Sequence, residues 1–386
     1  MADKLKRFAS RLLLLLNLVV VVLFLITCLA PYLNPANWWF VGFSGLLLPW
    51  LFFTLIIFIF IWTVVRPRRI LISLAAFLIG ATNIRVMLGM NKPSTFRMEK
   101  EKGNLRVMDW NVRRFTPFYT EKFDPNDTDN LKSIFGEISR YQPDVICLQE
   151  FYSTNAEWGS DNIGRFCKDL GYCHAVFARD HGYLNKVWSG TAIFSKYPVI
   201  DSLRYTFPDN NSQATESLIS ADLHIGHDTI RIYTTHLQSF SFRKKDYNDM
   251  RKIRDQEDTG LAASKSIFYK MRKAFQKRAV QAEETRSHIS NSPYPYILCT
   301  DLNDVPNSYA YFTLRGDRKD AFLEKGFGLG KTFASGNSRF LDWLPTLRID
   351  YVFLSDGVHT EQFTQMNRKL SDHRALVVDV SLPKGE

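Results

Sequence analysis

Residues 299–306 read C-T-D-L-N-D-V-P, and this stretch indicates most clearly what kind of fold the 386-residue chain adopts. The largely apolar run Tyr296–Thr300 predicts a strand, and Asp301 and Asn303 follow directly at its end. Other strand-like segments stop at polar groups in the same way, at Met108-Asp109-Trp110-Asn111, Leu148-Gln149-Glu150 and Thr234-Thr235-His236. The tail of the chain adds Arg348-Ile349-Asp350 and Ser371-Asp372-His373. Each alone is explained by a turn former or a solvated side chain. Their repetition indicates polar groups converging at one sheet edge.

The sequence around this stretch predicts a layered α+β or α/β domain. Further strands are expected at 105–112, 144–148, 173–178, 191–195, 218–224, 229–236, 348–354 and 375–380. Helices are expected at 128–140, 160–170, 244–290 and 307–315. Because strands dominate and helices interrupt them, we expect sheets covered by helices.

The first 92 residues differ from the rest and predict a membrane segment with about three transmembrane helices, at 12–30, 41–65 and 70–90. A basic start before an apolar run is also typical of a signal peptide, but the length of the run and the apolar sequence after it favour a retained helix. Residues 93–103 then form a polar linker, and residues 104–384 form the main domain.

Basic residues predict the orientation of this segment. They precede the first apolar run and occupy the 66–69 turn, whereas the 31–40 loop carries no charge. Since basic flanks prefer the cytoplasm, three spans place the main domain on the extracytoplasmic (periplasmic) side of an inner membrane. If the third segment does not cross, the domain is cytoplasmic.

The net charge bears on the kind of partner, and the cysteines bear on metal binding and disulfides. The net charge of +10 suits an anionic partner, and it equally suits basic flanks that orient a membrane protein. The five cysteines show no metal-ligand spacing and no dense disulfide framework. Cys167 and Cys173 are near enough in sequence for a disulfide, which the sequence leaves open.

The residue types at the strand ends predict metal-assisted phosphoryl chemistry. Mg²⁺ prefers carboxylate, amide and water oxygens. A histidine oriented by a carboxylate takes a proton from an attacking water. The sequence contains no phosphate-cradling Gly-rich loop, serine nucleophile elbow or H-E-x-x-H zinc motif.

Together, the stretches 144–150, 299–306, 348–351 and 371–373 resemble the endonuclease/exonuclease/phosphatase superfamily over roughly residues 104–382. That superfamily includes deoxyribonuclease I, exonuclease III, neutral sphingomyelinases and inositol polyphosphate 5-phosphatases. The resemblance implies a four-layer αββα sandwich with two mixed sheets and a Mg²⁺ cofactor, with Mn²⁺ as an alternative.

The resemblance also assigns the metal site. It implies that Asn111, Glu150 and Asp372 are metal-site residues, with Glu150 the main direct ligand. The chain departs from the family pattern at Arg113, where some nucleases carry an acidic residue, and at Thr300, which replaces the usual glycine. The first departure puts a second metal position in doubt.

Catalytic roles carry over by motif as well. Asp301 and Asn303 resemble the pair that contacts the attacking water and the scissile phosphate. His236 resembles the phosphate-binding histidine. His373 resembles the general base or phosphate-polarising histidine, with Asp350 orienting it.

The expected substrate is a phosphate ester, either a lipid headgroup or a nucleic acid. Residues 244–290 are basic with interleaved aromatics, so this stretch suits anionic headgroups beside a membrane or a nucleic-acid backbone. The alternative for residues 244–290 is a purely structural role, as a solvated helix that packs its aromatic residues on the sheet. A catalytically inactive membrane scaffold is the remaining alternative.

Overall fold

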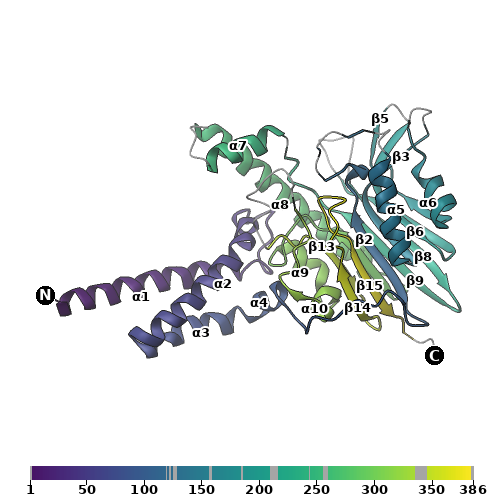
Figure 1. The fold of residues 1–386 in the computed structure, drawn as a ribbon. Coiled ribbons are helices and arrows are strands. Elements are labelled where there is room, and N and C mark those ends of the chain that lie inside the picture. Colours follow the sequence, from purple (N-terminus) through teal and green to yellow (C-terminus); the bar gives the residue numbers. More distant parts are fainter. Residues whose placement is uncertain are drawn as a thin grey trace.

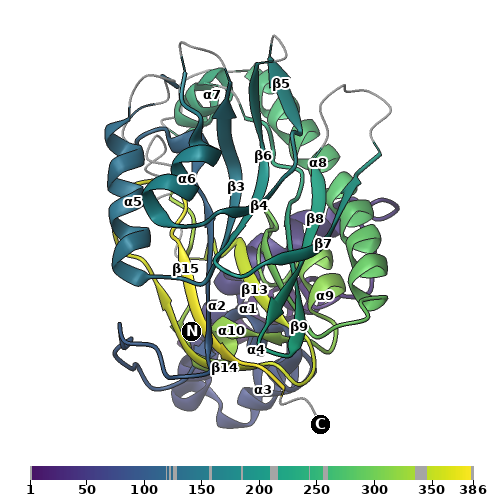
Figure 2. The same cartoon turned by 90° about the vertical axis from the view of Figure 1, so that its right-hand side faces the viewer.

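Two β-sheets pack face to face, and helices cover their outer faces (Figures 1 and 2). The computed structural model describes residues 2–118, 120, 123–124, 128–155, 159–183, 186–208, 216–242, 244–254, 260–334 and 346–383. Within these residues the arrangement is the predicted α/β sandwich with two mixed sheets.

The first sheet has the order β14-β15-β2-β3-β6-β4, and β5 also pairs with β6. Only the β2–β3 pair is parallel among the pairs of this sheet within the described residues. Its strands are β2 (Leu105–Asn111), β3 (Val145–Thr154), β4 (His174–Phe177), β5 (His181–Tyr183), β6 (Val187–Ser195), β14 (His359–Gln365) and β15 (Leu376–Ser381).

The second sheet has the order β11-β13-β10-β9-β8-β7. Here β9 and β10 are parallel, and the predicted hairpin is the antiparallel β8–β9 pair. The strands are β7 (Val199–Thr206), β8 (Ser217–Ile225), β9 (Asp228–His236), β10 (Tyr296–Asp301), β11 (Lys319–Asp320) and β13 (Asp350–Leu354).

Alternating side chains separate the layers. Along β2, Val107 joins the core between the two sheets, whereas its neighbour Met108 joins the core under the helices. Helices α5 (Asp129–Tyr141) and α6 (Asn162–Leu170) cover the first sheet, and α8 (Gly260–Ser290) and α9 (Tyr309–Arg315) cover the second. The result is four layers, α, β, β and α.

Several elements differ from the sequence-based expectation. The predicted helix 244–290 consists of α7 (Lys244–Arg254) and α8, and residues 255–259 lie outside the described part of the chain. Helix α10 (Ala321–Lys325) and strands β5, β7, β11 and β14 were not expected. Strands β7 and β14 lie at sheet edges and are largely exposed or half-buried, so their sequences lack a strong apolar pattern.

The N-terminal helices project from the sandwich (Figure 1). We call residues 2–87 the apolar segment. It contains α1 (Ala2–Thr27), α2 (Phe40–Val65), a short 3₁₀ turn (Pro67–Arg69), α3 (Ile70–Ile79) and α4 (Ala81–Met87). The first two helices are long and apolar enough to cross a membrane, whereas α3 and α4 are bent by 69° and add a third span only if the bent pair counts as one.

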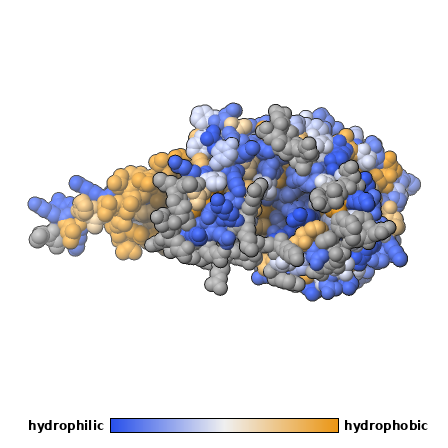
Figure 3. Space-filling view, turned by 90° about the horizontal axis from the view of Figure 1, so that it is seen from above, coloured by the Kyte–Doolittle hydropathy of each residue, from blue (hydrophilic) through white to orange (hydrophobic). Residues whose placement is uncertain are grey.

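The outer surface of these helices is apolar (Figure 3). Large exposed side chains cover it, among them Leu12, Leu15, Val19, Leu47, Phe53, Phe60, Leu71 and Leu78. The basic ends lie together, because Arg69 Nη1 donates to the Ser10 carbonyl at 2.8 Å. The main domain adjoins the opposite ends of α1 and α4, where β1 (Gly89–Met90) pairs with β12 (Phe327–Gly328).

The cysteines take two forms. Cys167 and Cys173 form a disulfide that links the end of α6 to the start of the β4 region. Cys28, Cys147 and Cys299 are free and buried.

Candidate active site

Strand register brings the predicted residues of the second sheet together. Asp301 ends β10 and is the register partner of His236 on β9 and of Asp350 on β13. Asn303 follows two residues after Asp301, with a left-handed backbone φ of 52°. These four residues therefore lie at one edge of the sheet.

The first sheet contributes from its facing edge. Asn111 is the last residue of β2. The Ser371 hydroxyl donates to the Asn111 carbonyl at 2.8 Å and holds the 371–373 turn beside it. His373 thus enters the site from the turn that precedes β15.

Glu150 reaches the site through a β-bulge. The sequence indicates that the strand stops at Glu150, but β3 continues to Thr154. The pairing with β6 shifts register between Leu148 and Phe151, and Glu150 has φ 49°. A bulge re-aims the side chain at its position, so the carboxylate turns toward Asn111, whose Nδ2 lies 3.3 Å from Oε1.

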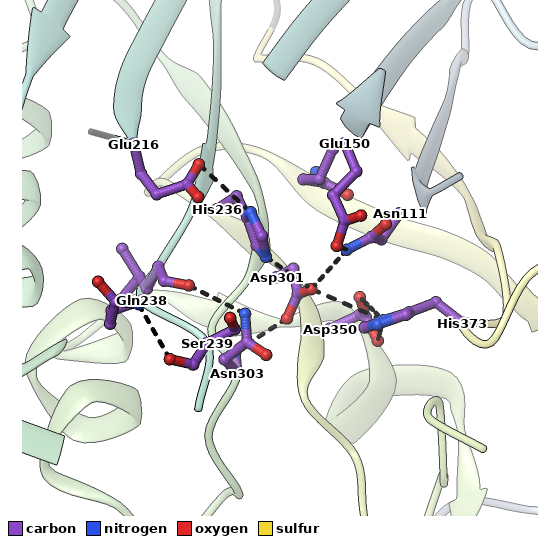
Figure 4. Close-up of polar contacts among 12 residues, drawn as sticks. Asn111, Glu150, Glu216, His236, Gln238, Ser239, Asp301, Asn303, Asp350 and His373 are labelled. Atoms are coloured by element: carbon purple, nitrogen blue, oxygen red, sulfur yellow. Dashed lines mark hydrogen bonds and ion pairs between the residues drawn. The ribbon is translucent and has the colours of Figure 1, made fainter. Parts of the chain in front are cut away.

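Asp301 is the hub of the site (Figure 4). Its Oδ2 accepts from Asn111 Nδ2 at 2.9 Å and lies 3.5 Å from His236 Nε2 and 3.7 Å from His373 Nδ1. Its Oδ1 accepts a hydrogen bond from the backbone N–H of Asn303 at 2.8 Å. The side chain is fully buried, so Asp301 forms the floor of the site.

Asp350 orients His373. The His373 Nδ1 lies 2.9 Å and 3.0 Å from the two Asp350 oxygens, and both side chains are buried. Burial acts to lower the pKa of His373, but the negative charges of Asp350 and Asp301 outweigh it and raise that pKa well above the ordinary value. The two carboxylates therefore favour the protonated imidazole, with Nδ1–H directed at Asp350.

His236 belongs to a second buried array that the sequence did not predict. Its Nδ1 lies 3.3 Å from Glu216 Oε2, and the other oxygen of Glu216 lies 3.2 Å from His181 Nε2. Burial acts to lower the pKa of His236, but Glu216, Asp301 and Glu150 together raise it to about 10. Burial acts to raise the pKa of Glu216, and the two histidines lower it to about 2. The Glu216 carboxylate therefore favours the protonated form of His236.

The third predicted metal-site residue, Asp372, is paired with Arg113. Arg113 Nε lies 3.4 Å from Asp372 Oδ2. Burial raises the pKa of Asp372, His373 and Arg113 oppose this, and the charge of Glu150 adds to it. Arg113, which stands where some nucleases of the family carry an acidic residue, thus places a positive charge beside the Asp372 carboxylate.

A cavity of about 1090 Å³ opens from the site. Glu150 and His236 line one end of it, together with Glu216 and His181. Lys273 and Lys277 of α8 and Ala36 of the loop between α1 and α2 line other parts. The cavity therefore connects the site with the near end of the apolar segment.

The structure brings every predicted site residue to the adjoining ends of the two sheets, but the sequence assigned no role to four further residues, which are Glu216, His181, Asp109 and Gln149. Glu216 and His181 carried no motif; Glu216 stands just before β8, and only its contact with His236 reveals it. Asp109 lies behind the site, where burial and then the charge of Asp350 raise its pKa well above the ordinary value. Gln149 Nε2 donates to Asp109 at 2.7 Å.

The sandwich and this site together define a phosphoric ester hydrolase. The chain belongs to the endonuclease/exonuclease/phosphatase family: the family model of that description matches residues 110–373. A second family model, described as a domain of unknown function, matches residues 10–87. No curated protein matches the chain.

Solved structures of the same family resemble the fold. The endonuclease/exonuclease/phosphatase from Beutenbergia cavernae is 19% identical with a TM-score of 0.52, over 73% of this chain and 72% of that one. The human Nocturnin catalytic domain is 17% identical with a TM-score of 0.47, over 73% and 96%. D. rerio TDP2 complexed with a single-strand DNA product is 16% identical with a TM-score of 0.49, over 72% and 99%.

Proposed function

We propose that the chain is a membrane-anchored, Mg²⁺-dependent phosphoesterase that hydrolyses a phosphodiester or phosphomonoester bond by attack of water. One observation carries this proposal: Asp301 is surrounded by Asn111, His236 and His373, and His236 lines a cavity together with Glu150. Both histidines have raised pKa values, so positive hydrogen-bond donors flank a carboxylate.

The donor set suits a hard divalent cation. Glu150 and Asp372 are carboxylates close enough for the charge of one to raise the pKa of the other, and the Asn111 amide lies beside Glu150. We assign Asn111, Glu150 and Asp372 to Mg²⁺ or Mn²⁺, which prefer such oxygens. When bound, the ion neutralises phosphate charge and stabilises the leaving oxygen.

A second group of possible ligands is better explained by hydrogen bonding. The ligand atoms of Asp301, Asp350 and His373 lie within 4.8 Å of one another. However, His373 Nδ1 is already 2.9 Å from Asp350, the distance of a charge-assisted hydrogen bond. We therefore assign this group to catalysis rather than to metal binding.

The side chains of the site take separate catalytic roles. We assign proton removal from the attacking water to Asp301, because Glu216 and Asp350 favour the protonated forms of the two neighbouring histidines. His236 and His373 then donate hydrogen bonds to phosphoryl oxygens and stabilise the charge that develops there. Asp350 holds His373, and Asn303 contacts the scissile phosphate beside Asp301.

The arrangement of the apolar segment supports its role as a membrane anchor. We assign residues 1–92 to the membrane segment, 93–103 to the linker and 104–384 to the catalytic domain. The basic N-terminal part of α1 and the basic 66–69 turn lie together, joined by the hydrogen bond from Arg69 to the Ser10 carbonyl. The catalytic domain adjoins the opposite ends of the helices. With basic ends in the cytoplasm, the catalytic domain lies on the extracytoplasmic side of the inner membrane.

Among the candidate substrates, we favour a lipid headgroup. The cavity runs from Glu150 and His236 to Ala36, in the loop that joins the two long apolar helices. Lys273 and Lys277 line it and suit an anionic group. A phosphate ester at the membrane surface would enter without leaving the bilayer.

The test uses the full chain in detergent micelles, with the Glu150→Ala variant as control. Mixed micelles of phospholipid or sphingolipid, plasmid DNA and bis(4-nitrophenyl) phosphate are each incubated with Mg²⁺ and with EDTA. We expect Mg²⁺-dependent hydrolysis of lipid that Glu150→Ala abolishes. Cleavage of plasmid alone would make the chain a nuclease, and equal rates in wild type and variant would favour an inactive scaffold.

A further inference from the structure

The loop formed by residues 301–307 connects the active site to the apolar segment. At its first end, the Leu302 amide donates to the Ile349 carbonyl at 2.8 Å, and Asn303 Nδ2 donates to the Leu237 carbonyl at 2.9 Å. These bonds lie between strands β9, β10 and β13. They set where Asp301 and Asn303 stand.

The other end of the loop is buried against three apolar helices. Asn83 Nδ2 of α4 donates to Asn307 Oδ1 at 2.7 Å, and Asn307 Nδ2 donates to the carbonyl of Thr27, the last residue of α1, at 3.0 Å. Gly45 of α2 packs so closely that a Cβ there would lie 2.4 Å from the Asn307 carbonyl oxygen. Asn83 and Asn307 are both buried.

A second catalytic motif has a similar connection. Arg348 stands two residues before Asp350, and its Nη2 donates to the carbonyl of Val86 near the end of α4. The Tyr351 hydroxyl donates toward the carbonyls of Arg348 and Asp304, at 2.6 Å and 2.9 Å. Arg348 and Asn307 therefore bind the C-terminal ends of α4 and α1, while their chain neighbours form the site.

These contacts satisfy groups that would otherwise be unpaired. The last carbonyls of a helix have no partner within the helix. A buried amide or guanidinium without a partner carries a desolvation cost. Because Asn307 satisfies both needs at once, the position of the helix ends and the position of the 301–307 loop are mechanically linked.

We propose that the apolar segment is a structural part of the active site, in which Asn83, acting through Asn307, is a positioning residue for Asp301 and Asn303. This inference rests on the proposed phosphoesterase function. It differs from simple anchoring, because an anchor joined by a free linker would leave the catalytic loop unaffected. A loop displaced by about 1 Å costs on the order of 10²-fold in rate when it holds reacting groups.

The test compares two buried asparagines of the same segment. Asn83→Ala removes the donor to Asn307. Asn17→Ala is the matched control, because Asn17 donates to Ser73 and accepts from Trp62 Nε1 wholly within the apolar segment. Full-length proteins in detergent micelles hydrolyse bis(4-nitrophenyl) phosphate with Mg²⁺, and kcat and KM are measured separately.

We expect Asn83→Ala to lower kcat by about tenfold or more with KM changed by less than about twofold, and Asn17→Ala to match wild type. Gly45→Ala is a second variant, expected to lower kcat by pressing on Asn307. Asn17→Ala is the control for this variant as well, because its hydrogen bonds lie wholly within the apolar segment.

Amide hydrogen exchange of a peptide covering residues 299–308 provides a readout independent of catalysis. We expect faster exchange there in Asn83→Ala and Gly45→Ala, and wild-type exchange in Asn17→Ala. Unchanged kcat together with unchanged exchange in Asn83→Ala and Gly45→Ala would overturn this inference. Equal hydrolysis by wild type and Glu150→Ala would instead refute the proposed function, and the exchange comparison would still decide whether the loop depends on the helices.

Discussion

Replacing Glu216 by glutamine should change the pH dependence of catalysis in a way that the structure specifies. Glu216 Oε2 lies 3.3 Å from His236 Nδ1, and after burial its charge is the largest influence on the pKa of His236. The rise of that pKa from 6.5 to about 10 corresponds to about 5 kcal/mol of preference for the protonated form. Asp301 and Glu150 contribute part of this preference and remain in the variant.

Protonated His236 is the form that donates to a phosphoryl oxygen, so activity should fall as pH rises through the pKa of His236. Wild-type kcat/KM should therefore have an alkaline limb near pH 10. Removing the Glu216 charge should move this limb to lower pH by about two pH units. The same pairing stabilises the fold: this contribution is complete between about pH 4.5 and pH 6.5, is lost as pH rises through about 10, and is lost as pH falls through about 2.

The assay is the pH profile of bis(4-nitrophenyl) phosphate hydrolysis in micelles, from neutral to alkaline pH. Glu284→Gln is a matched control, because Glu284 is a carboxylate of the same cavity that bonds Tyr205 rather than a histidine. It should leave the alkaline limb in place. An alkaline limb that stays at the wild-type pH in Glu216→Gln would refute the assignment of His236 as a protonated donor held by Glu216.

The remaining predictions concern the other charged groups of the site. Glu150→Ala should lower Mg²⁺-dependent activity by at least about 10²-fold and weaken Mn²⁺ binding in calorimetry; wild-type binding would remove Glu150 from the metal site. Asp350→Asn should lower kcat on the order of 10²–10³-fold because His373 loses its orienting charge, and a rate near wild type would show that His373 needs no such partner. Arg113→Asp should add a carboxylate beside Asp372 and allow a second Mn²⁺ ion to bind, measured by metal analysis of the dialysed protein. Unchanged metal content would indicate that Arg113 is not what limits the site. Dialysis against EDTA should abolish hydrolysis, and added Mg²⁺ or Mn²⁺ should restore it; full activity without metal would exclude the proposed cofactor.

The position of the site relative to the apolar segment bears on how the enzyme should be handled. The 301–307 loop contacts α1, α2 and α4, and the cavity reaches Ala36. A fragment that begins in the 93–103 linker would leave Asn307 and Arg348 without their partners. We therefore place each activity test on the full chain.

The sequence alone determined the architecture and most of the site. Strand-forming runs that end at Asn111, His236 and Asp301 predicted strands of both sheets and the residues at their adjoining ends. Asp350 stands instead at the start of its strand. Apolar runs predicted the long N-terminal helices, because a span of that length leaves a strong local signal. Edge strands β7 and β14 escaped prediction, since partly exposed strands carry little apolar pattern.

Only the tertiary structure decided how these parts act on one another. Glu216 becomes the partner of His236 because β8 and β9 pair, and Glu150 turns into the site because β3 bulges. Asn83 and Asn307 are 224 residues apart and meet through the packing of α4 on the catalytic loop. Local sequence patterns report backbone preference and burial, whereas a hydrogen bond between distant side chains depends on how the elements pack. The sequence therefore indicated the chemistry, and the packing decided which charges control it.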